Sequence, residues 1–227
     1  MLGGRPVDGG RPDPGAQLGC PAAHTCMGFL ISFDLYARAM GLISARRDEL
    51  RAPAASLPLA APLWSLTLWP STRPETSKTR TRDDFALIGA THPARAWLQQ
   101  LCPLLQAASA PGELLLQLTP AEYRRLYNVS RALAGLPPST PHRLRHGGAS
   151  ADALQGATDT ALADRGHWAS LQSVRRYRQP TRYMRQLERL TRRQAVDARA
   201  APSTILSLLN TIVADKSKLK RVPTEYS

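Results

Sequence analysis

The stretch that decides the fold runs from residue 141 to residue 177 and reads PHRLRHGGASADALQGATDTALADRGHWASLQSVRRY. A Ser-Thr pair precedes Pro141, and a proline after hydroxyl residues is typical of the first turn of a helix. We therefore expect a helix from about Pro141 to Leu154. His142 and Arg145 lie three residues apart on it, so they share one face.

Two further pieces of this stretch carry polar chemistry. One short helix is expected to end at Gly166, just before His167, and another to begin near Ser170 and to carry Tyr177 inside an arginine cluster. Taken alone, a histidine here is better explained as a polar residue at a helix start, and Tyr177 as a packed aromatic residue. Together, imidazole, guanidinium and phenol are the groups with which an enzyme attacks a phosphodiester through a tyrosine.

Outside this stretch, alternating apolar residues predict two strands. Residues 64–69 alternate strictly, and residues 85–88 have the composition of the returning strand. Lys78 lies between them in a strand–turn–strand unit, where a lysine is most often a solvated edge charge. Helical spacing dominates the rest of the chain, so the predicted fold class is mainly α with a small antiparallel β-sheet.

Helical spacing also predicts where the arginines fall. Apolar residues recur over residues 29–43 and predict one helix with Arg38 in its middle, paired with Asp34 one turn earlier. Residues 119–122 form a capping box with proline at the first helical position, which opens another helix. A long basic helix near the C-terminus is expected to break at Pro202.

Composition divides the chain into three parts. Residues 1–26 are rich in Gly and Pro and predict a disordered tail, and residues 27–200 form one domain. Residues 201–227 predict an amphipathic helix followed by a basic tail. The apolar stripe over residues 205–213 either packs on its own domain or docks on a neighbouring subunit, and the sequence does not decide between the two.

The charge favours a polyanionic partner. The chain carries 30 Lys and Arg residues against 17 Asp and Glu, a net charge of +13 at pH 7, which indicates nucleic acid or an acidic membrane face. Asp34 and Arg38 interrupt the longest apolar run, which argues against a membrane span. Three cysteines give no disulfide framework and fit an intracellular setting. Cys20, His24 and Cys26 lack a fourth ligand nearby, so no metal is expected.

The segments around these residues resemble the tyrosine recombinase (phage integrase) family, whose signature is H-x-x-R, then G-H, then Y. The family also carries an arginine in a helix near the start of its catalytic domain and a lysine on a β-hairpin. The matching positions, in chain order, are Arg38, Lys78, His142, Arg145, Gly166-His167 and Tyr177. The resemblance covers about residues 28–195. The amino-acid sequences of the segments are most similar to those of eukaryotic transposon-type members.

The resemblance implies a DNA breaking-rejoining catalytic core in residues 27–200, acting as a site-specific recombinase or integrase with no metal, ATP or small-molecule cofactor. Tyr177 would attack the scissile phosphate and form a 3′-phosphotyrosyl link. Arg38 and Arg145 would neutralise the two non-bridging oxygens by charged hydrogen bonds. His142 is the implied base or orienting group.

Two further residues complete the implied site. His167 would hydrogen-bond the scissile phosphate, and Lys78 would protonate the 5′-oxygen leaving group. The other arginines of the stretch are expected to contact DNA phosphates or to lie on the plain surface: Arg143, Arg175, Arg176 and Arg178. The implied partners are double-stranded DNA and further copies of the chain on it, in the nucleus for a eukaryotic mobile-element protein.

The chain departs from the family pattern at three places. Members often carry a Glu three residues after the first arginine, where this chain has Gly41. The interval from His167 to Tyr177 is ten residues, which leaves Tyr183 as a second candidate nucleophile. Residues 1–26 are too few to hold the family's N-terminal DNA-clamping domain, so we expect weak DNA binding, and the sequence leaves activity open.

Three other functions fit parts of the sequence. A non-catalytic DNA-binding remnant of a mobile-element recombinase would keep the basic surface without assembling the six side chains. A type IB topoisomerase uses similar chemistry. A helical RNA-binding protein fits less well, because the sequence lacks the aromatic stacking platform of the common RNA modules.

Overall fold

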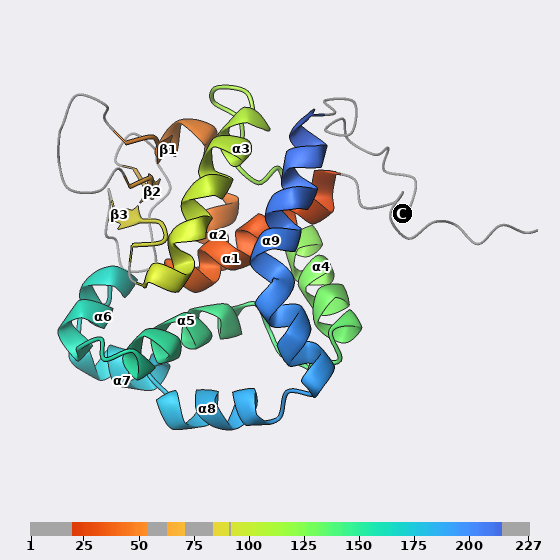
Figure 1. Cartoon of the computed structure of the whole chain (residues 1–227). Helices are drawn as coiled ribbons and strands as arrows, with labels where there is room; N and C mark the ends of the chain where they lie inside the picture. Colours follow the sequence, from red (N-terminus) through yellow and green to blue (C-terminus); the bar gives the residue numbers. More distant parts are fainter. Residues whose placement is uncertain (1–19, 54–62, 71–83, 91, 215–227) are drawn as a thin grey trace, which may run out of the picture.

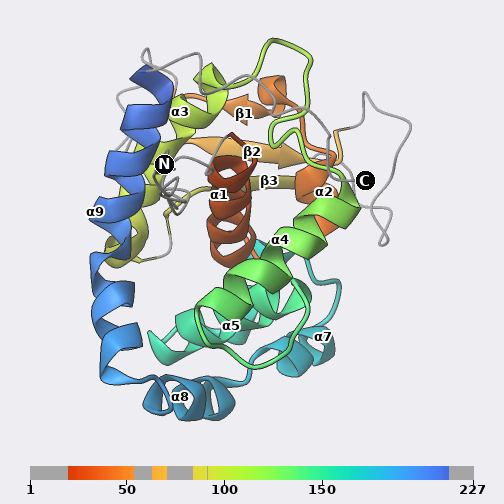
Figure 2. The ribbon, with the colours of Figure 1, turned by 90° about the vertical axis from the view of Figure 1, so that its right-hand side faces the viewer.

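The computed structural model describes residues 20–53, 63–70, 84–90 and 92–214. It is mainly helical with one small antiparallel sheet, which confirms the predicted fold class. Figure 2 shows helix α1 at the centre, with the sheet behind it, α4 and α9 beside it and α5 beneath it. Helices α5 to α8 form the lower layer of the molecule in Figure 1.

The elements have the following bounds. The α-helices are α1 (Cys20–Asp34), α2 (Ala39–Ile43), α3 (Leu101–Ala107), α4 (Pro120–Leu133), α5 (His142–Leu154), α6 (Asp159–Gly166), α7 (Leu171–Tyr177), α8 (Pro180–Glu188) and α9 (Arg192–Ala214). Two 3₁₀ helices are η1 (Arg47–Glu49) and η2 (Pro93–Gln100). The strands are β1 (Leu50–Arg51), β2 (Ser65–Leu68) and β3 (Asp84–Leu87), in the order β1-β2-β3.

The sheet contains both predicted strands and one that was not predicted. Strand β2 pairs antiparallel with β3, with Ser65 opposite Leu87 and Leu68 opposite Asp84. Strand β1 adds to the other edge of β2 through Leu50 and Arg51. Two residues are too few to show an alternating pattern, so β1 could not be predicted from periodicity.

Local capping chemistry explains where the helices begin. Thr119 caps α4 through the backbone N–H of Glu122, and the Glu122 carboxylate accepts from the Thr119 backbone, as the predicted capping box requires. Ser170 caps α7 by accepting from the backbone N–H of Ser173. Helices α5, α6 and α7 follow the predicted pattern, so the histidine, arginine and tyrosine of the signature lie on the predicted elements.

The predicted single helix over residues 29–43 is wrong. Helix α1 ends at Asp34, Tyr36 has a left-handed backbone with φ of 49°, and Arg38 is the extended residue before α2. Asp34 does not pair with Arg38, because its carboxylate contacts Arg165 at 3.0 Å and Arg95 at 3.5 Å instead. These long-range ion pairs override the local helical pattern.

Two predicted boundaries also fall inside helices. Residues 20–26, which the composition assigns to a disordered tail, form the first turns of α1, and burial lowers the pKa of His24 to about 4. Helix α9 continues through Pro202 and so crosses the predicted boundary after residue 200. Both errors arise because composition and a single proline are weaker determinants than tertiary packing, in which α1 contacts α4 and α5 and α9 contacts α3.

The apolar residues form two cores. The larger one joins α1, α2, the sheet, η2, α3 and α4 around side chains such as Ile31, Leu66 and Leu105. The smaller one lies between α5, α6 and α7, and its buried members are Tyr36, Ala149, Leu162, Ala163, Trp168 and Val174. Tyr177 packs against the edge of this small core, which places the predicted nucleophile at its surface.

A close crossing of α1 and α5 joins the two cores. A Cβ atom on Gly148 would lie 1.9 Å from the backbone oxygen of Phe33, so only glycine allows this approach. The Gly-Gly pair of the quoted stretch therefore has a packing role. It brings the middle of α5 against the end of α1, where Tyr36 follows.

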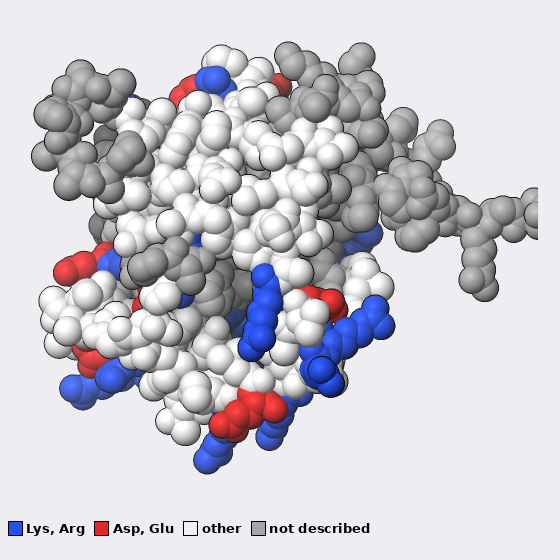
Figure 3. Space-filling view, in the orientation of Figure 1, with Lys and Arg blue, Asp and Glu red and all other residues white. Residues whose placement is uncertain are grey.

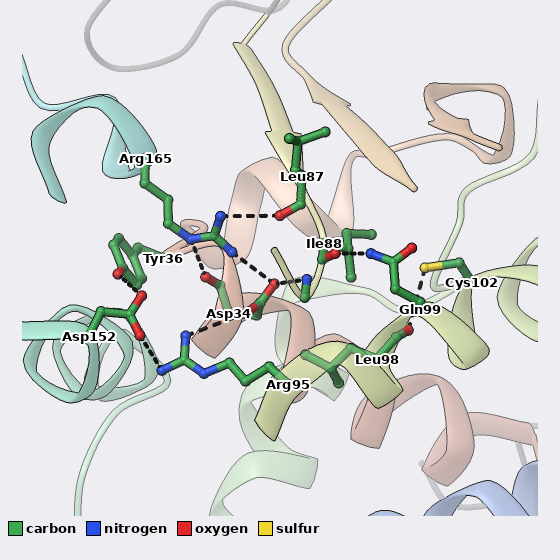
Figure 4. Close-up of polar contacts among 11 residues, drawn as sticks. Asp34, Tyr36, Leu87, Ile88, Arg95, Leu98, Gln99, Cys102, Asp152 and Arg165 are labelled. Carbon is green, nitrogen blue, oxygen red and sulfur yellow. Dashed lines mark hydrogen bonds and ion pairs between the residues drawn. The ribbon is translucent and has the colours of Figure 1, made fainter. Parts of the chain in front are cut away.

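A buried ion network ties the same region together (Figure 4). Arg165 of α6 donates to the Asp34 carboxylate and to the Asp34 carbonyl at 3.0 and 2.9 Å, and the N–H of Gly89 donates to that carboxylate at 2.7 Å. Arg95 bridges Asp34 and Asp152 of α5, the latter at 2.5 Å. The network thus links α1, α5, α6 and η2.

Within the described ranges, no helix combines the length and the apolar character needed to cross a bilayer.

The network predicts a large and position-specific stability loss. Asp34→Asn should lower the free energy of unfolding by about 3–5 kcal/mol, because two guanidiniums lose the charge of a fully buried partner. The matched control, Asp159→Asn, breaks the partly exposed pair with Arg178 and should cost less than about 1 kcal/mol. Urea denaturation followed by circular dichroism measures both, and equal losses would contradict the assignment.

Candidate functional site

Arg145 is the most constrained residue of the site. It lies one turn into α5 and is 5% exposed. One terminal nitrogen donates to the backbone oxygen of Gly166 at 2.8 Å, and the other donates to that of Tyr36. Its Nε–H has no partner among the described residues. The guanidinium is therefore fixed by two carbonyls and keeps donors that those carbonyls do not use.

Tyr177 closes the cluster from the end of α7. Its half-buried ring stacks between His146 and Trp168, at centroid distances of 4.5 and 4.8 Å. The Arg145 guanidinium carbon lies 5.2 Å from the Tyr177 ring centroid and 4.5 Å from that of Trp168. Such contacts favour a positive charge beside the rings. The Tyr177 backbone is also held, because its carbonyl accepts from Ser150 Oγ at 3.2 Å.

His142 and Arg38 flank the cluster. The exposed His142 ring contacts the Tyr177 ring edge-on at 5.5 Å between centroids. Arg38 lies at the start of α2, and its charge lowers the pKa of both His142 and Arg145. Because α1 ends at Asp34, Arg38 does not lie on the predicted helix. Its charge still acts on the cluster.

The structure gives less information about the last two predicted catalytic residues, His167 and Lys78. His167 ends α6 with a left-handed backbone, φ of 50°, between Gly166 and Trp168, which both contact Arg145. Its backbone therefore belongs to the cluster. Lys78 lies outside the described residues. Tyr183, the second candidate nucleophile, lies on α8 and is half-buried. Burial raises the pKa of its phenol, the charge of Arg95 opposes this shift and the charge of Asp152 adds to it.

The predicted DNA-contacting arginines differ in their surroundings. Arg143, Arg175 and Arg176 are exposed, whereas Arg178 forms an ion pair with Asp159 at 3.0 Å. Among the residues that the structure describes, Figure 3 shows arginines gathered over the lower part of the molecule, around α6 to α8 and the lower ends of α4 and α9. The basic surface therefore lies on the side of the molecule that carries the Tyr177 cluster.

The field inside the cluster is positive. Burial first, and then the charges of its neighbours, lower the pKa of His142. Burial also lowers the pKa of His146, and three arginines add to this effect while a hydrogen bond with the Tyr177 backbone opposes it. Burial and Arg38 lower the pKa of Arg145 to about 10, so this guanidinium stays charged at neutral pH. At neutral pH both imidazoles are uncharged and can accept a proton.

Two residues of the cluster had no predicted role. His146 lies four residues after His142, on the same face of α5, and the two rings meet edge-on at 5.1 Å. That spacing could have indicated from the sequence that His146 lies beside His142. Trp168 stacks on Tyr36 and Tyr177, and its position after Gly166-His167 carried no chemical signal of its own.

The described residues contain no group of three His, Cys, Asp or Glu side chains that could hold a metal ion. The cluster itself offers two neutral imidazoles, a phenol and two guanidiniums. Such a set can bind an anionic oxygen, accept a proton and offer a nucleophilic oxygen.

Comparison with protein-family models, with curated proteins and with solved structures found no match to this chain.

The electrostatics predict the titration of the two histidines. NMR of the imidazole Cε1–Hε1 groups should give pKa values below 6.5 for both His142 and His146. Arg182→Gln should raise the pKa of His146, because one of the charges that disfavour the imidazolium is removed. Arg51→Gln, an exposed change on β1, should leave it unchanged. Titration of either histidine above 6.5 would contradict the positive field.

Proposed function

We propose that the chain acts on double-stranded DNA as a strand transferase of the tyrosine recombinase type, with Tyr177 as the nucleophile. The Tyr177 oxygen attacks the scissile phosphorus, the bond to the 5′-oxygen breaks, and a 3′-phosphotyrosyl link forms. The phenol gives up its proton to a base such as His142, and the departing 5′-oxygen takes one up. The reverse attack by a 5′-hydroxyl restores the DNA, so no external energy source is consumed.

One observation carries this proposal. His142, Arg145 and Tyr177 are up to 35 residues apart in the sequence and yet lie in one cluster, with Tyr177 within 5.5 Å of both by ring or guanidinium distance. Arg38, more than a hundred residues earlier, acts on the same cluster through its charge. These residues were selected by their order along the chain alone. That they also lie close together in space is an independent property, and it supports the proposal.

The surroundings of Arg145 suit the stabilisation of a charged transition state. Two carbonyls fix the plane of the guanidinium, so little reorganisation is required when charge develops on a phosphate oxygen. The Nε–H is buried and has no partner among the described residues, so it would donate to that oxygen only where the phosphate reaches into the cluster. Under this proposal the exposed Arg143, Arg175 and Arg176 contact the DNA backbone, and further copies of the chain assemble on the DNA.

A second candidate function also has an observation in its favour. Arg145 is only 5% exposed and the Tyr177 ring is stacked on both faces. A cluster packed in this way also suits a non-catalytic DNA-binding remnant, in which the same contacts only stabilise the small core. The two functions differ in whether a covalent bond to DNA forms.

A trapping experiment separates these functions. Incubation with nicked duplex DNA of randomised sequence and with supercoiled plasmid should give a protein–DNA adduct that survives detergent, because release of the cleaved fragment prevents rejoining. Tyr177→Phe should abolish the adduct, because it removes the attacking oxygen. Tyr183→Phe is the matched control and should leave adduct formation within about twofold of the original.

Three outcomes are informative. An adduct that persists in Tyr177→Phe and disappears in Tyr183→Phe would contradict the assignment of the nucleophile. Salt-sensitive DNA binding without any adduct supports the non-catalytic remnant. Relaxation of the supercoiled plasmid by a monomer would instead indicate a topoisomerase.

A further inference from the structure

The two histidines that contact Tyr177 also line a small cavity. Its volume is about 270 Å³, and its lining residues are Thr140, His142, Arg143, His146, Gln179 and Arg182. This is below the ~300–1,000 Å³ of sites for drug-sized ligands. The cavity therefore suits a small polyatomic group with a few waters.

The lining is built for an oxygen-rich anion. Two arginines and two histidines face the cavity, and within the described part of the chain no acidic side chain lines it. Thr140 and Gln179 add a hydroxyl and an amide, which can donate hydrogen bonds to such an anion. A positively charged cavity with several convergent donors is the arrangement that binds phosphate.

The electrostatics of the histidines agree with this reading. Burial lowers the pKa of His146, and the charges of Arg143 and Arg182, which line the same cavity, lower it further. Arg145 and Arg38 act on His142 in the same sense. An anion in the cavity would offset these charges, so its binding would raise the pKa of both histidines.

Arg182 is hydrogen-bonded, and it forms no ion pair with an acidic residue in the part of the chain that the structure describes. Its terminal nitrogen donates to the Gln179 side-chain oxygen at 3.4 Å, and the Gln179 backbone N–H donates to Ser150 Oγ at 2.9 Å. Ser150 in turn donates to the Tyr177 carbonyl. The end of α7, the start of α8 and the cavity are therefore connected through hydrogen bonds.

We propose that this cavity binds a phosphate group, held by Arg143, Arg182 and the imidazoles of His142 and His146. Under the function proposed above, on which this second part rests, the group is a DNA backbone phosphate next to the one that Tyr177 attacks. His142 would then contact both phosphates, because its ring touches Tyr177 and lines the cavity. Arg182 is a binding residue of the cavity and takes no part in the chemical step.

The first test uses inorganic phosphate and the protein alone. Phosphate is added up to about 50 mM at constant ionic strength, which covers millimolar dissociation constants, and the imidazole signals are followed by NMR. The signals of His142 and His146 should shift saturably, and those of the buried His24 should not. Arg182→Gln should weaken phosphate binding about tenfold, whereas Arg51→Gln should not change it.

The second test uses a DNA duplex and distinguishes a backbone phosphate from a free one. The slope of log affinity against log salt concentration should fall by about 0.9 in Arg182→Gln, the contribution of one phosphate contact. The control Arg51→Gln, on β1 at the opposite end of the molecule from α8 (Figure 1), should keep the original slope. Phosphate binding with an unchanged slope assigns the cavity to a free phosphate group.

Neither test depends on covalent chemistry, so the two proposals fail separately. Absence of a saturable shift with phosphate, or the same shift with chloride, overturns the cavity proposal even where the Tyr177 adduct forms. A saturable shift without any adduct upholds the cavity and leaves only the function proposed for Tyr177 without support.

Discussion

The arrangement of the site depends on two buried carboxylates, those of Asp34 and Asp152, and on the two arginines that pair with them. Arg95 bridges the two, and Arg165 ties Asp34 to α6. Removing four charged groups from water is unfavourable unless each is paired, so the four elements that carry them are held in one mutual position. Burial raises the pKa of Asp34, and the two guanidiniums together with the N–H of Gly89 oppose that shift and favour the carboxylate.

This constraint explains why the cluster forms where it does. Asp34 ends α1, and the chain then turns through Tyr36, whose hydroxyl donates to Asp152 and whose carbonyl accepts from Arg145. The close approach at Gly148 allows α5 to reach that carbonyl. The same turn places Arg38 at the start of α2, within electrostatic range of the cluster. A tightly determined turn thus serves both the packing and the candidate chemistry.

The sequence predicted the elements that local chemistry controls and missed those that long-range contacts control. The structure confirms the helices of the quoted stretch and the pairing of β2 with β3. Hydroxyl residues cap α6 and α7, alternation marks the two strands, and α5 begins after Pro141 without a side-chain cap. The break after Asp34 was not predictable, because its cause is ion pairing with Arg165, 131 residues away in the sequence. In the site, the sequence pointed to His142, Arg145 and Tyr177, and the helical spacing of His146 was overlooked. Trp168 was missed because stacking partners from separate helices leave no pattern in sequence.

In the proposed reaction the oxygen of Tyr177 bonds to DNA phosphorus, and mass spectrometry tests this step most directly. Protein incubated with nicked DNA would be digested with nuclease and protease, and the peptides would be searched for a nucleotide bound through its 3′-phosphate. We expect that modification on the peptide that ends α7, with fragment ions that assign it to Tyr177. A nucleotide on Tyr183 or on another residue, or DNA-bound protein whose Tyr177 peptide is entirely unmodified, would contradict it.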